Sequence, residues 1–395
     1  MSSITTETVN MLDMASSMLA SAVSASMTIR SLAQPDSANG EVDGDQKNAR
    51  LKADGSFVTD ADFAAQSIIT RAVLRVSDQV RILGEENPEG VAKLADDDKL
   101  QFTTADQIMY ETCRRELCMR YKSMKLQQSG SEVAEISGAA LPLSPTSAFK
   151  KDSTNFTLSE DEQKDLVVDA SRVCVIIDPL DGTKSYAKGD YDAVSILISL
   201  NIDYQPHFGV ICKPFGYEGV SPILDSECAS VYGGPLIGGG FIAGGAPLRV
   251  YKAAVPEDGA SSVKEADLPR AIISSSRSKG VVEDVCRHLG SIGLVHPEPL
   301  HISGAGEKSL RLVLRRNNEA LWFFPKSGTS LWDIAASDAI LRSLGGKVTD
   351  KFGRPLDYSK PRTEAENMDG IIASSDEKLH AECIRIFQEK EWDEE

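Results

Sequence analysis

The sequence predicts a mixed α/β protein with two units, and three observations lead to this fold class. Apolar runs of strand character dominate the stretch from residue 173 to about residue 215. Beyond about residue 260, strand-like and helical segments alternate, which is typical of helices layered on sheets. The chain has 395 residues, of which 41% are hydrophobic, so it can bury a large core. We expect a first unit over 1–260, with an insertion at about 91–165, and a second unit over 261–395.

The first 90 residues predict two helices and a strand. Apolar side chains recur at roughly helical spacing between Met11 and Met27, which indicates an amphipathic helix. A second helix with looser periodicity is expected from Asp60 to about Val80. The run "VRILGEEN" then predicts a short strand that leads into Glu85 and Glu86.

The insertion has a different composition from its surroundings. A helical stretch at 105–124 is followed by residues 127–154, which are rich in Ser, Gly, Ala and Pro. We interpret this second part as an exposed, partly disordered segment. The residues "SEDE" at 159–162 resemble a capping box and predict a short helix after it.

The second unit is predicted as alternating strands and helices. The predicted strands are "RAIISSS", "EALWFFP" and "DGIIASS", and the predicted helices are "GVVEDVCRHLG", "WDIAASDAILRSLGG" and "EKLHAECIRIF". Trp322, Phe323 and Phe324 are expected in the core, and Trp332 is expected to pack beside Asp333. Gly345 and Gly346 should end the helix that begins near Asp333.

Charge and composition exclude several functional classes. The formal net charge is −17 and the sequence pI is about 4.9, which disfavours nonspecific binding to nucleic acid or to an anionic membrane. No apolar run approaches the roughly 18 residues of a membrane-spanning helix. The seven cysteines are scattered, so we expect reduced thiols, and neither they nor the histidines have zinc-like spacing. We predict a cytoplasmic protein with no required protein partner. The Ser-rich N-terminus leaves an organellar address as the alternative, but Glu7 and Asp13 disfavour it, because transit peptides are usually Arg-rich and acid-poor.

Three groups of carboxylates follow predicted strands or begin a predicted helix. Glu85 and Glu86 follow "VRIL", Asp178 and Asp181 lie at the end of "VCVIID" and just after it, and Asp333 lies in the first turn of a helix. Each group alone has an ordinary explanation as a cap, a turn or a solvated surface. Together they offer the hard oxygen ligands that Mg²⁺ prefers, and two such ions can clamp a phosphate and activate a water.

Two further segments fit a phosphate site. Gly182 and Thr183 offer backbone N–H groups where a helix begins, which is a favourable place for a phosphate. Asp60 and Asp62 precede the second helix and could orient a water, whereas capping of that helix by Asp60 or Thr59 is the alternative interpretation.

The motifs "GEEN", "DPLDGTKSY" and "LWDIAASDAILRSLGG", in this order, resemble the lithium-sensitive, magnesium-dependent phosphatases of the inositol monophosphatase superfamily. The resemblance covers about 50–90 and 165–375, and it implies a layered α-β-α-β-α sandwich of the sugar-phosphatase type. It implies two or more Mg²⁺ ions and direct in-line hydrolysis of a phosphate monoester. The implied metal ligands are Glu85, Asp178, Asp181, Asp333 and the backbone carbonyl of Leu180.

The same resemblance implies roles for the residues around the ligands. Glu86 would support the metal ligands without binding the metal, and Gly182 and Thr183 would hold the phosphate. Asp62, with Thr183, would orient and deprotonate the attacking water, and Asp60 would then be the capping residue.

Within the superfamily, the chain resembles the 3'(2'),5'-bisphosphate nucleotidases, which remove the 3'-phosphate of adenosine 3',5'-bisphosphate. Lys184 after the Thr-containing motif and the runs "AAQSII", "IISSSRS" and "SGAGEKSLRLV" carry this likeness. It implies substrate contacts from Ser276, Gly304 and Lys308, with Lys279 standing where these enzymes often have His and still able to pair with phosphate. The runs "AILRSLGG" and "GAGEKSL" also resemble inositol polyphosphate 1-phosphatases, so an inositol polyphosphate is the alternative substrate. A non-catalytic metal or nucleotide sensor is the third hypothesis.

Overall fold

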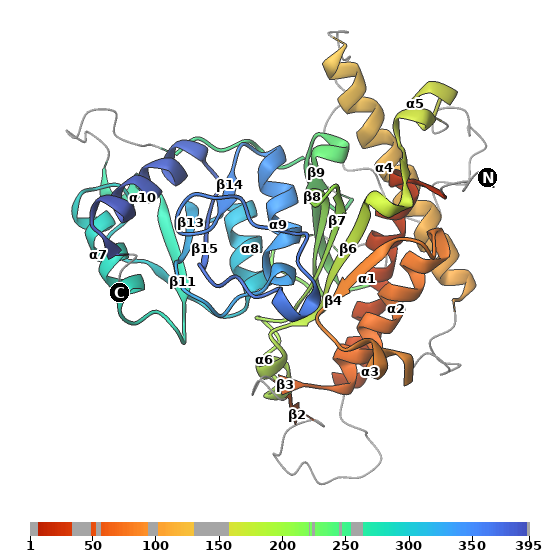
Figure 1. Ribbon diagram of the computed structural model, residues 1–395, viewed down its shortest axis with the longest axis horizontal. Helices are drawn as coiled ribbons and strands as arrows, with labels where there is room; N and C mark the ends of the chain where they lie inside the picture. Colours follow the sequence, from red (N-terminus) through yellow and green to blue (C-terminus); the bar gives the residue numbers. More distant parts are fainter. Residues whose placement is uncertain are drawn as a thin grey trace, which may run out of the picture.

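The computed structural model describes residues 7–33, 49–52, 57–93, 102–129, 158–220, 222, 226–244, 247–253 and 264–392. Helices and sheets alternate in layers across the molecule, in the order α-β-α-β-α (Figure 1). This confirms the predicted fold class. The predicted division into two units near residue 260 stays a prediction.

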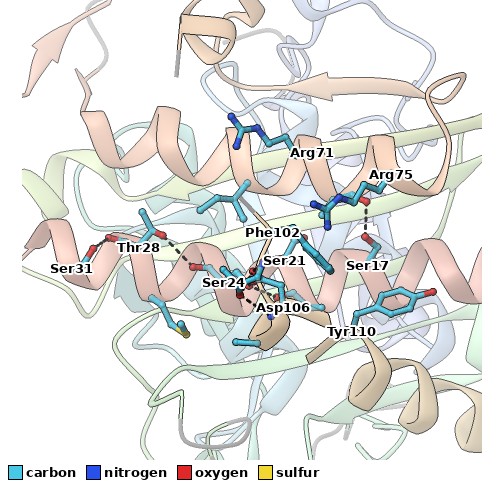
Figure 2. A pocket seen from close by; sticks show the side chains of 16 residues that line it. Ser17, Ser21, Ser24, Thr28, Ser31, Arg71, Arg75, Phe102, Asp106 and Tyr110 are labelled. Carbon is cyan, nitrogen blue, oxygen red and sulfur yellow. Dashed lines mark hydrogen bonds between the residues drawn. The ribbon is translucent and has the colours of Figure 1, made fainter. Parts of the chain in front are cut away.

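Helices α1 (Met11–Ala33), α2 (Asp60–Val76) and α4 (Thr104–Gln128) form the first layer. Small side chains let α1 lie close to its neighbours: the Ser17 hydroxyl donates to the Ala72 carbonyl of α2 at 2.7 Å, and the Ser24 hydroxyl donates to Asp106 of α4 at 2.5 Å (Figure 2). A cavity of about 450 Å³ remains between the three helices. Helix α2 ends four residues earlier than predicted, because Ser77 is extended.

The first sheet has the strand order β10-β9-β8-β7-β6-β4 and is antiparallel except for the parallel pair β4 and β6. Val, Ile and Leu fill both of its faces, as expected for a sheet that helices cover on two sides. Its strands are β4 (Arg81–Gly84), β6 (Val173–Asp181), β7 (Ser195–Ile202), β8 (Gln205–Lys213), β9 (Ala229–Gly234) and β10 (Gly239–Ile242).

Helices α8 (Ala305–Leu314) and α9 (Leu331–Ser343) lie between the two sheets (Figure 1). The backbone of α9 approaches β8 so closely that a Cβ on Gly209 would lie 2.0 Å from the Ala336 carbonyl oxygen. Glycine at this position therefore sets how near α9, and the aspartate in its first turn, can come to the first sheet.

The second sheet has the strand order β12-β11-β13-β15-β14, and α7 and α10 cover its outer face (Figure 1). Trp322, Phe323 and Phe324 of β13 are buried as predicted, and Trp332 packs, half-buried, against the same core. The elements of this layer are α7 (Val281–Ser291), α10 (Glu377–Glu389), β11 (Arg270–Ser274), β12 (Leu300–Ile302), β13 (Glu319–Phe324), β14 (Lys347–Thr349) and β15 (Ile371–Ser374).

Short elements complete the chain. The predicted capping box is confirmed, because Ser159 and Glu162 cap a short α5 reciprocally. Of the segment 127–154, predicted to be exposed and partly disordered, residues 130–154 lie outside the described residues, and α4 extends to Gln128. All seven cysteines are buried free thiols, and none of the described helices is both long and apolar enough to cross a bilayer.

The remaining elements are α3 (Pro88–Lys93), α5 (Glu160–Asp165), α6 (Thr183–Ala187), and the short strand pairs β1 (Thr8–Asn10) with β5 (Val167–Asp169) and β2 (Arg50–Leu51) with β3 (Phe57–Val58).

Candidate metal and phosphate site

Strand β6 delivers two aspartates to the edge of the first sheet. Asp178 pairs with Leu197 of β7 and Asp181 pairs with Ser195, and the register is irregular between them. Pro179 lies in this irregular stretch, where it has no N–H to give to the sheet. The irregularity breaks the usual alternation of side chains along a strand, so both carboxylates can turn to the same side.

The third aspartate arrives from the start of α9. The Asp333 carboxylate accepts the Ser330 N–H at 2.6 Å and closes a capping box that begins the helix. Oxygen atoms of Asp178, Asp181 and Asp333 all lie within 4.8 Å of one another. A strand end and a helix start that are far apart in sequence therefore bring three carboxylates to one point.

The negative charges of the three clustered aspartates repel one another, which makes their ionisation unfavourable. Burial, followed by the negative charges of Glu85, Asp181 and Asp333, raises the pKa of Asp178 well above its usual range. Burial and the neighbouring Asp181 raise the pKa of Asp333 to about 7, and burial also raises the pKa of Asp181. A cluster of hard oxygen ligands that resists its own ionisation is suited to a divalent cation such as Mg²⁺, because the cation would remove the repulsion.

Glu85 and Glu86 lie beside this cluster and share a lysine that the sequence did not single out. The Lys52 Nζ is 2.8 Å from an oxygen of Glu85 and 2.6 Å from one of Glu86. Gln66 holds the backbone of Glu86 on both sides, because it accepts the Glu86 N–H at 2.8 Å and donates to the Glu86 carbonyl at 2.9 Å. Burial and the adjacent Glu85 raise the pKa of Glu86. No pattern in the sequence marks Lys52.

Asp62 and Thr183 meet in the interior. The Thr183 hydroxyl lies 2.9 Å from Asp62 Oδ1 and 3.0 Å from the Leu180 carbonyl oxygen. Burial raises the pKa of Asp62 to about 7, with Glu86 and Glu85 adding to the shift and Thr59 opposing it. Asp62 is completely buried, with 0% of its surface exposed.

The predicted capping role of Asp60 is wrong. Thr59 is the N-cap of α2, and Asp62 completes the capping box by accepting the Thr59 N–H at 2.8 Å. Asp60 instead points to solvent and pairs with Arg50. The reason is geometric, since a capping box needs its acidic side chain three residues after the cap.

Two glycines allow the chain to close around Asp181. Gly182 (φ +86°) and Gly304 (φ +76°) both have left-handed backbones, and a Cβ on either would lie 2.8 Å from the Ala193 carbonyl oxygen. Gly304 precedes α8, whose first N–H groups, those of Ala305 and Gly306, donate to the Asp181 carboxylate at 3.1 and 2.7 Å. Gly182 likewise precedes α6, as predicted for a helix start at this position.

Lys308 faces the carboxylates from the first turns of α8. Only 6% of it is exposed, its Nζ donates to the Gly304 carbonyl at 2.8 Å, and it lies 5.2 Å from the Trp322 ring. Burial lowers the pKa of Lys308 to about 8, although Asp181 and Asp333 oppose the shift. Lys308 is therefore a buried cation beside the cluster and not a solvated surface lysine.

The structure does not bring Ser276 and Lys279 to the carboxylates. Both are exposed in the loop between β11 and α7, and no hydrogen bond or ion pair joins either side chain to the cluster within the described part of the chain. Their neighbour Arg277, which the sequence analysis did not select, donates to the Gly328 carbonyl and contributes to the lowered pKa of Lys308. This loop therefore adds positive charge near the site through Arg277.

The model of the inositol monophosphatase family matches residues 11–391 of this chain. The chain belongs to the inositol monophosphatase family. The family match begins at α1 and includes the insertion, so it extends beyond the two stretches that carry the motifs.

Among curated members of this family, the chain is similar to bisphosphate nucleotidases. It is 28% identical over 232 residues to "3'(2'),5'-bisphosphate nucleotidase 1" of Dictyostelium discoideum, covering 58% of this chain and 68% of that one. It is 30% identical over 205 residues to the human protein of the same name, covering 51% of this chain and 56% of that one. The match thus spans little more than half the length of the human relative.

Solved structures of family members have the same fold. Inositol monophosphatase-II of Staphylococcus aureus MSSA476 superposes with a TM-score of 0.51 at 14% identity, covering 93% of this chain and 92% of that one. At this identity the likeness concerns the fold alone.

Proposed function

We propose that this family member is a Mg²⁺-dependent phosphomonoesterase that converts adenosine 3',5'-bisphosphate to AMP and phosphate. The observation that carries the proposal is the convergence of Asp178, Asp181 and Asp333 within 4.8 Å, next to the hydrogen-bonded pair of Asp62 and Thr183. The similarity to curated bisphosphate nucleotidases supports the nucleotide substrate.

The carboxylates and one carbonyl would hold the metal. Glu85, Asp178, Asp181, Asp333 and the Leu180 carbonyl are the proposed ligands of two or more Mg²⁺ ions. Bound Mg²⁺ would supply charge neutralisation for the phosphate and for the departing oxygen. Glu86 would keep Glu85 in place, since Gln66 fixes its backbone and Lys52 joins the two side chains.

Asp62 is the proposed general base, acting together with Thr183. In the reaction, the oxygen of a water bonds to phosphorus while the bond between phosphorus and the ribose 3'-oxygen breaks. A proton of that water passes to Asp62, and the 3'-oxygen takes a proton from solvent. A base is most effective when its pKa lies near the working pH, and burial raises the pKa of Asp62 to about 7.

The substrate would be held from two sides. The N–H groups of Gly182 and Thr183, at the start of α6, are the proposed seat of the transferred phosphate. Gly304 and Lys308, from the start of α8, would contact the nucleotide, with the buried Lys308 cation meeting a phosphate. Ser276 and Lys279 would contact it from the exposed loop after β11.

The test is phosphate release from purified protein and adenosine 3',5'-bisphosphate, with Mg²⁺ and with a chelator in its place. We expect release only with Mg²⁺, inhibition by lithium, and loss of both metal binding and release in Asp181→Ala. The matched control is Asp190→Ala, which removes an exposed aspartate of the same segment and should keep both properties. Release that is equally fast in the chelator would overturn the metal-dependent mechanism.

An inositol polyphosphate stays the second candidate substrate, because "GAGEKSL" around Lys308 also fits the polyphosphate 1-phosphatases. Inositol 1,4-bisphosphate in the same assay separates the two. Turnover of neither substrate would leave the non-catalytic sensor as the better explanation.

A further inference from the structure

A cavity of about 580 Å³ lies against β4, the strand that leads to Glu85 and Glu86. Its walls come from α2, β4, α3 and a segment of the second half of the chain, Ser359–Arg362. Figure 1 shows α2, α3 and β4 together at this side of the first sheet. The apolar part of the wall is formed by Leu74, Ile82, Leu83, Pro88, Val91 and Pro361. This volume is large enough for a small organic molecule.

Three arginines, Arg71, Arg81 and Arg362, give the cavity a positive charge. Arg81 donates to the backbone carbonyls of Ser359 and Lys360, and Arg362 donates to those of Gly84 and Glu85. Across the described ranges, no carboxylate lies within ion-pair distance of either guanidinium. The charge of Arg362 also acts on the Glu86 carboxylate, whose pKa it lowers, but its hydrogen bonds go to neutral carbonyls. A cation held in this way can still pair with an anion.

The acid in the same wall is already neutralised. Glu86 lines the cavity, but its carboxylate pairs with Lys52 at 2.6 Å, a residue outside the lining. On the neighbouring helix, Ser67 also lines the cavity, and its buried hydroxyl has no hydrogen-bond partner among the described residues. The lining thus combines an apolar surface, three arginines and one acid that is paired with Lys52. Two of the arginines, Arg81 and Arg362, have no carboxylate within ion-pair distance among the described residues.

We propose that this cavity binds a small organic anion with an apolar body, whose charged group pairs with Arg81 and Arg362. The site is distinct from the proposed catalytic centre, because none of the three clustered aspartates lines it. It is also next to that centre, since Glu86 belongs to its wall and Arg362 binds the Glu85 carbonyl. An occupant would therefore contact the backbone that carries the first proposed metal ligand.

The cavity between α1, α2 and α4 provides a built-in control. Figure 2 shows Arg75 of α2 there, and its guanidinium lies 3.5 Å from the centre of the Phe102 ring. Arg75 lines only that cavity, whereas Arg81 and Arg362 line only the cavity behind Glu86. Arg75→Gln and Arg81→Gln therefore remove the same charge from two different cavities.

The experiment is calorimetric titration of the full-length protein with naphthalene-1-sulfonate, an apolar anion that a phosphatase cannot hydrolyse. We expect saturable binding that Arg81→Gln weakens by about tenfold, as for loss of one charged hydrogen bond. Leu74→Trp, which places an indole in the cavity from a half-exposed helix position, should abolish binding. Arg75→Gln should keep the affinity within about twofold, a change below the size of one hydrogen bond.

Each other outcome overturns the proposal. Absence of binding at millimolar probe, or binding that survives Leu74→Trp, would exclude this cavity. Loss of binding in Arg75→Gln would assign the probe to the cavity between α1, α2 and α4. Equal affinity for the neutral analogue 1-naphthalenemethanol would show that the arginines do not select an anion. The readout is heat of binding, so it can be measured even if the folded protein has no phosphatase activity. A negative result here therefore says nothing about the proposed function, and a lack of activity says nothing about this cavity.

Discussion

The Thr183 hydroxyl donates a hydrogen bond of 2.9 Å to Asp62, a residue 121 positions away in the chain. The bond joins the start of α2 to the start of α6, and its second acceptor is the Leu180 carbonyl at 3.0 Å. Two helix starts and one irregular strand end thus meet at a single hydroxyl. This contact connects the proposed base to the proposed metal ligands.

Asp62→Asn should lower kcat by roughly 10²- to 10⁴-fold, because an amide cannot accept the proton of the attacking water. Thr183→Ala should cause a loss of similar size, and the double variant should lose little more, since both residues act as one unit. Phosphate release measured under substrate saturation checks this. Asp60→Asn is the matched control, because Asp60 is exposed and lies outside the site; losses that multiply in the double variant would contradict a shared role.

Asp178→Asn should stabilise the metal-free protein while it abolishes activity. The substitution removes one of several repelling carboxylates, and the Asn carbonyl can still accept the Leu180 N–H. A gain of about 1 kcal/mol in the free energy of unfolding is the usual size of such relief. Thermal unfolding in chelator and in Mg²⁺ measures both effects: Mg²⁺ should stabilise the wild type and not the variant.

The control for this prediction is Asp338→Asn. Asp338 is equally buried but pairs with Arg342 at 2.8 Å and accepts the Tyr358 hydroxyl. Its replacement should destabilise the protein, because Arg342 loses its carboxylate partner. Destabilisation of both variants in chelator would contradict the idea that repulsion is stored at the cluster.

Lys308→Met should raise KM for a bis-phosphorylated substrate by roughly 10- to 100-fold, the size of one charged hydrogen bond to phosphate. The free energy of unfolding should not fall, because burial already disfavours the charged form of Lys308. Steady-state kinetics and thermal unfolding separate the two effects. Lys378→Met on the exposed face of α10 is the control, and a change in stability without a change in KM would assign Lys308 a structural role only.

His380 makes the fold sensitive to acid. Burial, with help from the Lys347 cation and against the Glu377 carboxylate and the Ile372 carbonyl, lowers the pKa of His380 from 6.5 to about 4. A lowered folded-state pKa gives stability that is fully present above pH 6.5 and is lost as the pH falls towards 4. In His380→Gln, the fall in unfolding free energy over this window should be smaller by up to about 3 kcal/mol. Urea unfolding at several pH values measures it, and the exposed His301→Gln should behave like the wild type.

Much of the fold could be predicted because each long element carries its own signal. The apolar periodicity of α1, the capping pattern of α5 and the apolar runs of β6 and β8 are all local features, and the structure confirms them. The end of α2 was predicted too late, because Val80 continues an apolar pattern although Ser77 has already left the helix. The close approach of α9 at Gly209 depends on a contact between distant segments, so no local pattern could show it.

The candidate site could be predicted only where residues form motifs. The three clustered aspartates belong to motifs and do come together. Lys52 belongs to no motif, and Arg277 lies in the run "IISSSRS" but has no predicted role. Their charges matter only once folding brings Glu85 and Lys308 near them. On local grounds the sequence leaves Asp60 and Thr59 both open as the cap, and the family resemblance implies Asp60. The structure confirms Thr59, whose spacing to Asp62 is that of a capping box.

The most direct test of the central claim is a comparison of kcat/KM for adenosine 3',5'-bisphosphate and inositol 1,4-bisphosphate, with Mg²⁺ titrated from zero. We expect no phosphate release without metal, saturable activation by Mg²⁺, and at least about a tenfold preference for the nucleotide, because a site built for one substrate leaves polar groups unpaired with another. A preference for the inositol phosphate would contradict the assigned substrate. Release from neither substrate at any Mg²⁺ concentration would contradict the proposed activity itself.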